Sequence, residues 1–200
     1  MKYRCALPLL ICLAGPGCRP AAAPTSVTPA AQDRASSPAA AVEQIRLDIR
    51  SWQETQQWVA AQRGKVVVLD IWSSWCVPCQ REFPHLVELH REYPGRVACV
   101  SVNIDYTGSK DQPPASFRDK VHAFLSKQGA TFQNVICSDP DLDVLAQLKL
   151  GAIPAVLVYD RAGQLQKRFD NDDQQYGEHG VSYREHVVPL VEKLLAEGQN

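Results

Sequence analysis

The residues best suited to chemistry are two cysteines separated by two residues, Cys76 and Cys79. They follow the apolar run 66–69, so we place them where a buried strand gives way to a helix. A thiol at the start of a helix faces unpaired backbone N–H groups and the positive end of the helix dipole. Such positions lower the pKa of a cysteine from about 8.5 to roughly 3.5–7.5, which favours the thiolate. Because the thiolate is the nucleophile in thiol–disulfide exchange, we expect redox chemistry at this pair.

Two other interpretations of the cysteine pair are a structural disulfide and half of a zinc site. Zinc needs four ligands, commonly from two closely spaced pairs. The other cysteines beyond the N-terminal region, Cys99 and Cys137, are single residues on separate predicted strands, so we expect no metal site. Buried free cysteines behave as small apolar groups, and we expect inert thiols at both positions. A second disulfide between them is the alternative if the two strands are neighbours.

The composition bounds the class of protein. The chain has 200 residues with 45% hydrophobic content, which is enough for one domain with a core. The formal net charge of −1 provides no basic surface, so we do not expect a nucleic-acid partner.

Residues 1–18 have the pattern of an export signal. Lys2 and Arg4 precede an apolar run from residue 5 to 14, which is shorter than the ~20 residues of a membrane-spanning helix. The segment ending at Cys18 resembles a bacterial lipoprotein processing site, although Gly15 stands where such sites usually carry Leu. We therefore expect Cys18 to be lipidated, and cleavage near residues 21–23 without a lipid is the alternative.

Residues 19–41 are rich in Ala, Pro, Ser and Thr and predict a flexible linker. A lipid-bearing cysteine followed by a linker would hold a globular domain near a membrane. We therefore expect a periplasmic or cell-envelope protein, in a compartment where disulfides persist unless something reduces them.

Strand and helix patterns alternate in the remaining chain, which we assign to one domain at residues 42–198. Proline at position 84 should bend its helix rather than end it, because the apolar stripe continues beyond it. The pattern predicts a mixed sheet with helices on both faces. The strands are expected at 45–49, 65–72, 96–103, 132–137, 155–159 and 164–169, and the helices at 51–62, 76–93, 113–128, 141–150 and 182–196.

Several of these residues stand in the order and spacing of a known family. The sequence resembles the thioredoxin fold at Asp70, Trp72, Trp75-Cys76-Val77-Pro78-Cys79, Pro84 and Gly151-Ala152-Ile153-Pro154. The segment 101–150 is similar to the helix–strand insertion that distinguishes TlpA-like and ResA-like disulfide reductases from plain thioredoxin. The resemblance covers residues 42 to about 198 and implies a thioredoxin-like α/β fold with this insertion.

The resemblance also implies roles for particular residues. Cys76 would attack the disulfide of a partner, and Cys79 would be the resolving thiol that closes a Cys76–Cys79 disulfide. Pro154 would be a cis-proline that faces the active site. The backbone of Ile153 would pair with an extended substrate segment, and Trp75 would belong to the substrate-facing surface.

Asp70 lies six residues before Cys76 inside an apolar strand, where a carboxylate is costly and its pKa should be raised. We expect it to accept the proton of Cys79, directly or through a water molecule. The alternative is a buried carboxylate with a purely structural role. Many TlpA-like proteins carry a neutral residue here, so this position is more like plain thioredoxin.

We assign no chemical role to two other charged regions. We interpret Arg81 and Glu82 as a solvated helix face and the acidic segment 170–180 as a surface loop.

Together these features predict an exported thiol:disulfide oxidoreductase without a cofactor. The resemblance favours the reducing direction, with exported proteins bearing disulfides or cysteines as substrates, cytochrome c apoproteins among them, and a membrane thiol electron donor. One alternative is a disulfide oxidase or isomerase on the same fold. The other is a non-catalytic binding domain or copper carrier.

Overall fold

The computed structural model describes residues 44–172 and 175–197. The leader 1–18, the linker 19–41 and the lipidation site Cys18 lie outside these described residues and remain predictions. In the part of the chain that the structure describes, none of the helices combines the length and the apolarity that a membrane span requires.

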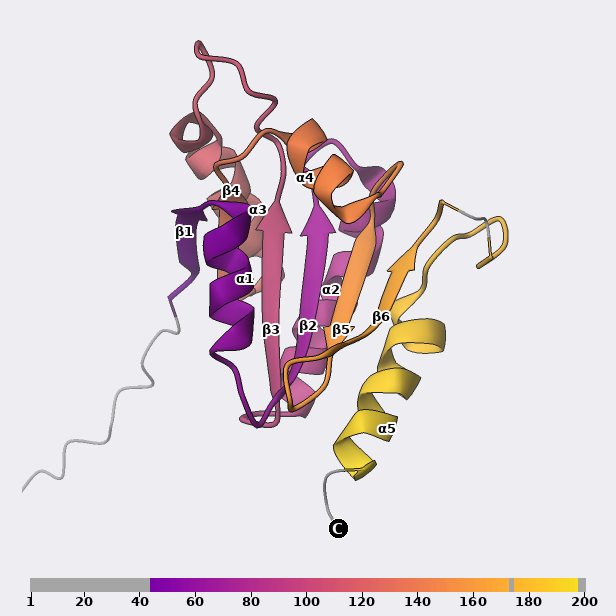
Figure 1. Cartoon of the computed structure of the whole chain (residues 1–200). Coiled ribbons are helices and arrows are strands. Elements are labelled where there is room, and N and C mark those ends of the chain that lie inside the picture. The colour runs from indigo at the N-terminus through magenta and orange to yellow at the C-terminus, as the bar shows by residue number, and fades with distance from the viewer. Residues whose placement is uncertain (1–43, 173–174, 198–200) are drawn as a thin grey trace, which may run out of the picture. The chain divides into compact units, whose positions relative to one another are not determined.

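The described residues form a six-stranded mixed sheet with the strand order β1-β4-β3-β2-β5-β6 (Figure 1). Strands β1, β4, β3 and β2 are parallel to one another, whereas β5 pairs antiparallel with β2 and with β6. Every residue of β2 is buried, as expected of a central strand covered on both faces. The strands are β1 (Arg46–Arg50), β2 (Val66–Trp72), β3 (Val97–Asn103), β4 (Gln133–Cys137), β5 (Ala155–Tyr159) and β6 (Leu165–Asp170).

Helices cover both faces of this sheet, which confirms the predicted architecture. In Figure 1, α1 and α4 lie in front of the sheet and α2 lies behind it. The front helices share one apolar core with the sheet, and α2, α3 and α5 share a second core on the opposite face. The helices are α1 (Trp52–Ala60), α2 (Val77–Glu92), α3 (Arg118–Gln128), α4 (Asp141–Leu148) and α5 (Val188–Glu197).

Local sequence signals explain where several elements begin and end. Ser51 caps α1 in a reciprocal capping box, because its hydroxyl accepts the N–H of Glu54 while the Glu54 carboxylate accepts the N–H of Ser51. The turn between β5 and β6 closes with a hydrogen bond from the N–H of Gly163 to the carbonyl of Asp160. Gly163 has a φ of 73°, a conformation that favours glycine, so the turn sequence fixes the hairpin.

Two predicted helices differ from the expectation at their first turns. The helix predicted from residue 113 begins as a 3₁₀ helix, Pro114–Phe117, before α3. The terminal helix begins as a wide π-helical turn, Tyr183–Val187, before α5. Pro189 follows this turn and has no N–H to donate to the carbonyl of Glu185, so the normal α-helical pattern is interrupted there.

Among the described residues, the two cysteines outside the pair, Cys99 and Cys137, are both free and buried. Their strands, β3 and β4, are neighbours, which was the condition for a second disulfide. Cys99 nevertheless packs in the core behind the sheet, whereas Cys137 packs in the core in front of it. Opposite faces of the sheet separate the thiols, so the structure excludes the bridge and agrees with two isolated thiols.

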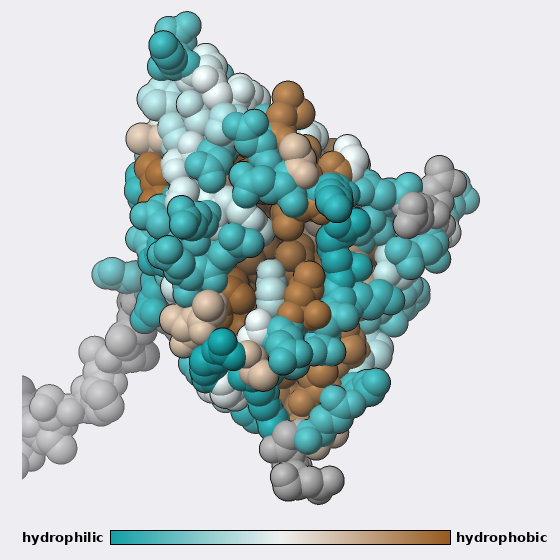
Figure 2. All heavy atoms as spheres, viewed as in Figure 1, coloured by the Kyte–Doolittle hydropathy of each residue, from teal (hydrophilic) through white to brown (hydrophobic). Residues whose placement is uncertain are grey.

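The surface view shows how polarity is distributed on the front face. Figure 2 shows hydrophobic residues gathered in a band between α1 and β6, framed by hydrophilic residues. Four large apolar side chains are exposed among the described residues: Trp75, Val77, Leu142 and Leu165. Two of them, Trp75 and Val77, flank Cys76 in the sequence.

Candidate functional site

Cys76 and Cys79 form a disulfide at the start of α2. The strand β2 ends at Trp72, three residues follow, and Cys76 is the N-cap of the helix. Its Sγ accepts a hydrogen bond from the N–H of Cys79 at 3.2 Å, so the sulfur occupies the place of a capping oxygen. In the reduced protein this N–H and the helix dipole would stabilise a thiolate at Cys76.

The disulfide lies directly beneath the surface, beside exposed apolar side chains. Cys76 is 5% exposed and Cys79 is 2% exposed, so the first cysteine is the more accessible of the two. Trp75 and Val77 on either side of Cys76 are 62% and 74% exposed. A partner that reaches the Cys76 sulfur would therefore contact these apolar side chains.

Asp105, just beyond the end of β3, holds the segment that leads to Cys76. Its Oδ1 accepts the N–H of Ser74 at 2.8 Å, and its Oδ2 accepts the hydroxyl of Ser74. Gln80 of α2 adds a hydrogen bond from its side-chain amide to the carbonyl of Ser74 at 2.7 Å. Our sequence reasoning missed Asp105. The available signal was a carboxylate that follows a buried strand at the edge where the parallel strands β2 and β3 both end.

The second part of the site is the Ile153–Pro154 peptide bond, which is cis. The carbonyl oxygen of Ile153 lies 3.8 Å from the Sγ of Cys76. Strand β5 begins at Ala155, so this bond lies just before the paired part of the strand. The fold thereby brings together two segments that are 77 residues apart in the sequence.

Asp70 lies in β2 on the same side of the sheet as the disulfide. Side chains alternate along a strand, and its neighbours on that face, Val68 and Trp72, pack in the same core as Cys76 and Cys79. Asp70 is 3% exposed, and burial raises the pKa of its carboxyl group to about 7. Its Oδ2 accepts a hydrogen bond from the Tyr183 hydroxyl at 2.5 Å, and this bond opposes the rise in pKa. Its Oδ1 is buried without a hydrogen-bond partner.

Glu82 corrects our interpretation of Arg81 and Glu82 as a solvated helix face. The Arg81 side chain is 54% exposed, but that of Glu82 is only 15% exposed. Its Oε2 accepts the backbone N–H of Tyr183 at 3.1 Å. The reason is helical periodicity, because Glu82 is three residues after Cys79 and lies beside the buried stripe of α2.

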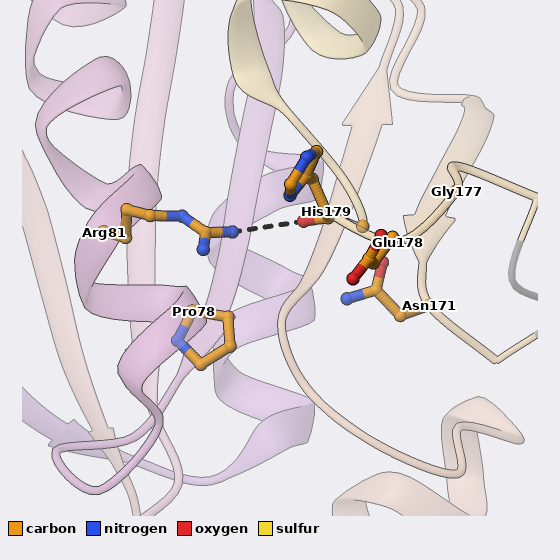
Figure 3. Close-up of a pocket in the computed structure, with 7 residues that line it drawn as sticks. Pro78, Arg81, Asn171, Gly177, Glu178 and His179 are labelled. Atoms are coloured by element: carbon orange, nitrogen blue, oxygen red, sulfur yellow. Dashed lines mark hydrogen bonds between the residues drawn. The ribbon is translucent and has the colours of Figure 1, made fainter.

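A hollow of about 620 Å³ opens beside the start of α2, between this helix and the loop that precedes α5 (Figure 3). Pro78 and Arg81 line it on the helix side, and Asn171 and residues 177–180 line it on the loop side. The Arg81 guanidinium reaches across it and donates to the carbonyl oxygen of His179 at 3.1 Å. The segment predicted as an acidic surface loop therefore forms one wall of a hollow next to the cysteine motif.

His85 on α2 bears on the copper-carrier alternative, which requires a histidine that joins the two thiols. Its Nδ1 lies 3.0 Å from Oε2 of Glu88 on the same helix. Within residues 44–172 and 175–197, no three His, Cys, Asp or Glu side chains are grouped so that they could hold a metal ion.

The parallel sheet with an antiparallel hairpin, the disulfide at the start of α2 and the cis-proline together define a thioredoxin-like protein. Comparison of the sequence with family models gives the particular family: residues 33–182 match the Redoxin model, and the chain belongs to the Redoxin family.

Proteins of similar sequence are named as thiol-disulfide oxidoreductases or thiol:disulfide interchange proteins. The chain is 33% identical over 106 residues to the thiol-disulfide oxidoreductase ResA of Geobacillus kaustophilus, a match that covers 52% of this chain and 54% of that protein. It is 30% identical over 139 residues to the thiol:disulfide interchange protein CycY of Rhizobium leguminosarum bv. viciae, covering 69% and 64% of the two chains. The chain therefore spans only about half the length of the ResA relative that it matches.

Solved structures share the fold at lower sequence identity. A thiol-disulfide isomerase from Corynebacterium glutamicum superposes with a TM-score of 0.51 at 19% identity, covering 68% of this chain and 83% of the other. A DsbF homologue from Corynebacterium diphtheriae gives a TM-score of 0.50 at 21% identity, covering 68% and 75%. These similarities establish the thioredoxin-like fold.

Proposed function

We propose that this protein is an exported thiol:disulfide oxidoreductase that cycles Cys76 and Cys79 between the dithiol and the disulfide. One observation carries the proposal: the disulfide caps the start of α2, and the Cys76 sulfur lies 3.8 Å from the carbonyl oxygen that precedes cis-Pro154. A structural disulfide needs neither an exposed apolar rim nor a helix start that stabilises its thiolate. The sequence similarity to proteins named as thiol-disulfide oxidoreductases supports the same activity.

In the proposed cycle, the Cys76 thiolate attacks one sulfur of a partner's disulfide and releases the other as a thiolate. Cys79 then loses its proton to Asp70 and attacks the Cys76 sulfur of the mixed disulfide. This step releases the second partner thiolate, leaves the Cys76–Cys79 disulfide and transfers two electrons to the partner. A carboxyl group whose pKa lies at about 7 can accept and release this proton near neutral pH.

The proposed substrate is an extended protein segment that contains a disulfide or a cysteine. Its backbone would pair with Ile153 beside Pro154, as an added strand pairs with the edge of a sheet. Apolar side chains of the segment would rest on Trp75, whose exposure is unusual for a residue of its size.

We further propose that the domain at residues 42–198 works outside the cytoplasm, held to a membrane through lipidated Cys18 and the linker 19–41. A reducing role in that compartment requires a membrane thiol electron donor to regenerate the dithiol. Mass spectrometry of the mature N-terminus tests the anchor: a diacylated Cys18 is expected, and an unmodified terminus beyond residue 18 would reject it.

The activity is tested by reduction of insulin with dithiothreitol as electron source. We expect turnover above background, loss of turnover in Cys76→Ser, and unchanged turnover in Cys137→Ala, which removes a buried thiol on the opposite face of the sheet. No turnover in the unmodified protein would favour the binding domain or copper carrier. Equilibration with glutathione then gives the reduction potential, and a value close to that of strong oxidants would favour the oxidase.

The roles of the two cysteines are tested by trapping. In Cys79→Ser the resolving thiol is absent, so we expect mixed disulfides between Cys76 and partner proteins to accumulate on non-reducing gels. Cys76→Ser is the matched variant and should trap little, because Cys79 is the more buried of the two residues. The reverse pattern would exchange the two assignments.

A further inference from the structure

Tyr183 connects two carboxyl groups of the site from a distant part of the chain. It lies in the π-helical turn before α5 and is 1% exposed. Its hydroxyl donates to Oδ2 of Asp70 at 2.5 Å, and its backbone N–H donates to Oε2 of Glu82 at 3.1 Å. Through its hydroxyl Tyr183 contacts the central strand β2, and through its backbone N–H it contacts α2, so it connects these two elements.

We propose that Tyr183 is a positioning residue for the proton transfer from Cys79, because its hydroxyl occupies Oδ2 of Asp70 and leaves Oδ1 to receive the proton. This inference rests on the proposed function and goes beyond it by assigning the two carboxylate oxygens. The unpartnered Oδ1 supports the assignment, since a buried polar atom without a hydrogen bond is costly in this state, and a partner at another stage of the cycle explains why it is retained.

The groups that face Asp70 come from each element packed against it. Glu82 on α2 is an acidic neighbour that raises the pKa of Asp70, and Tyr183 lowers it by donating a hydrogen bond. Burial raises the pKa of the Cys99 thiol on β3, and the nearby charge of Asp70 raises it further, so this thiol stays protonated. Burial and the charge of Asp70 raise the pKa of Tyr183 well above its usual value, so the phenol stays a donor at all working pH values.

These contacts determine the direction in which loss of the Tyr183 hydroxyl should shift the pKa of Asp70. The Tyr183 hydroxyl stabilises the ionised form of Asp70, which is the form that accepts a proton. In Tyr183→Phe the ring remains and the hydroxyl is lost, so the pKa of Asp70 should rise above about 7. Proton transfer from Cys79 should then require a higher pH.

The test is the pH profile of insulin reduction in unmodified protein and in Tyr183→Phe. We expect the acidic limb of the variant to move toward higher pH by about one unit, which makes its rate at pH 6 roughly ten-fold lower. The matched control is Tyr93→Phe, which removes a hydroxyl that also reaches the C-terminal helix, through Glu192, but does not touch Asp70. Its profile should coincide with that of the unmodified protein.

A second measurement separates this inference from the proposed function. Carbon-13 NMR titration of the Asp70 carboxyl group in the reduced proteins reports its pKa without turnover, and it should be higher in Tyr183→Phe. An unmoved carboxyl pKa, or equal shifts in Tyr183→Phe and Tyr93→Phe, would overturn the positioning role. An unmodified protein that does not reduce insulin would instead overturn the proposed function, whatever the titration gives.

Discussion

Asp70 is the residue at which the requirements of the site and those of the fold conflict most directly. It is the one charged residue of a strand whose other members are apolar, and all of that strand is buried. Burial shifts its pKa from the ordinary 3.8 to about 7. The proton acceptor that we propose at this position would therefore come at the expense of stability.

The linkage between proton binding and folding determines how the contribution of Asp70 to stability changes with pH. The folded protein keeps the proton on Asp70 up to a pH of about 7, whereas the unfolded chain releases it near 3.8. Between these values the folded state binds more protons than the unfolded state, so the contribution of Asp70 to stability falls as the pH rises. Below the lower value both states are protonated and the cost disappears.

We predict that Asp70→Asn stabilises the oxidised protein at pH 7 by a few kcal/mol, on the order that this pKa shift implies. The gain should grow between pH 4 and pH 7 and then level off, as measured by guanidinium unfolding at a series of pH values. Asp111→Asn, at an exposed position, is the control and should show no such growth. A gain that is constant with pH would mean that Asp70 is not protonated in the folded protein.

At the scale of elements, the start of α2 is fixed by contacts from outside the helix. Asp105 from the end of β3 binds both the N–H and the hydroxyl of Ser74, and Gln80 binds the Ser74 carbonyl. These contacts hold the three residues between β2 and Cys76, so the N-cap sulfur is placed before any partner arrives. In the proposed cycle, such preorganisation would reduce the freedom that must be lost when the mixed disulfide forms.

We predict that Asp105→Ala destabilises the oxidised protein by about 2–4 kcal/mol, because the half-buried Ser74 N–H loses the carboxylate that accepts its hydrogen bond. Ser74→Ala removes only the hydroxyl bond and should cost about 1 kcal/mol. Guanidinium unfolding gives both values, and amide exchange at Ser74 should accelerate in Asp105→Ala alone. Equal costs in the two variants would show that Asp105 does not hold this segment through its N–H.

Elements with strong local signals could be predicted from the sequence, and contacts between distant segments could not. The capping box at Ser51, the turn ending at Gly163 and the apolar run of β2 each carry their own physical cause, so their elements were predicted to within a few residues. Tyr183 could not be found in this way, because its role depends on α5 folding back onto β2. It also lies just beyond residues 33–182, which match the family model.

The site residues divide in the same way: residues in short motifs could be predicted from the sequence, and residues whose surroundings come from distant segments could not. Cys76, Cys79 and Pro154 belong to short motifs, and the structure places all three together. Glu82 was misassigned because a charged residue next to Arg81 is usually solvated, and only the position of the C-terminal segment shows what covers it. The prediction therefore failed where a side chain is buried by an element far away in the sequence.

At the scale of the whole molecule, the residues of the proposed chemistry are confined to one side of the sheet. The core behind the sheet contains both cysteines of the motif, the free Cys99 and Tyr183, and Asp70 lies in the same layer. The core in front of it contains apolar side chains of α1 and α4. Ile153 packs against both cores, so the cis-proline segment lies where the two layers meet.

Helix α5 completes the layer that contains the site, although it follows Cys79 by more than a hundred residues. Its residues Val191, Leu194 and Leu195 are buried in the same core as the disulfide. If this packing is cooperative, loss of α5 contacts should weaken the entire domain rather than release the helix alone. Tyr183, at the base of α5, would then remain in place for as long as the domain is folded.

We predict that Leu195→Ala lowers the free energy of unfolding by about 2–4 kcal/mol, because Leu195 is 2% exposed and its removal leaves a cavity. Leu165→Ala removes the same side chain at a position that is 50% exposed and should change stability by no more than about 0.5 kcal/mol. Unfolding followed by tryptophan fluorescence and by far-ultraviolet circular dichroism should give one coincident transition in both variants. If circular dichroism instead reported an earlier loss of helix in Leu195→Ala, α5 would unfold on its own, and the contacts of Tyr183 would be lost while the rest of the domain stays folded.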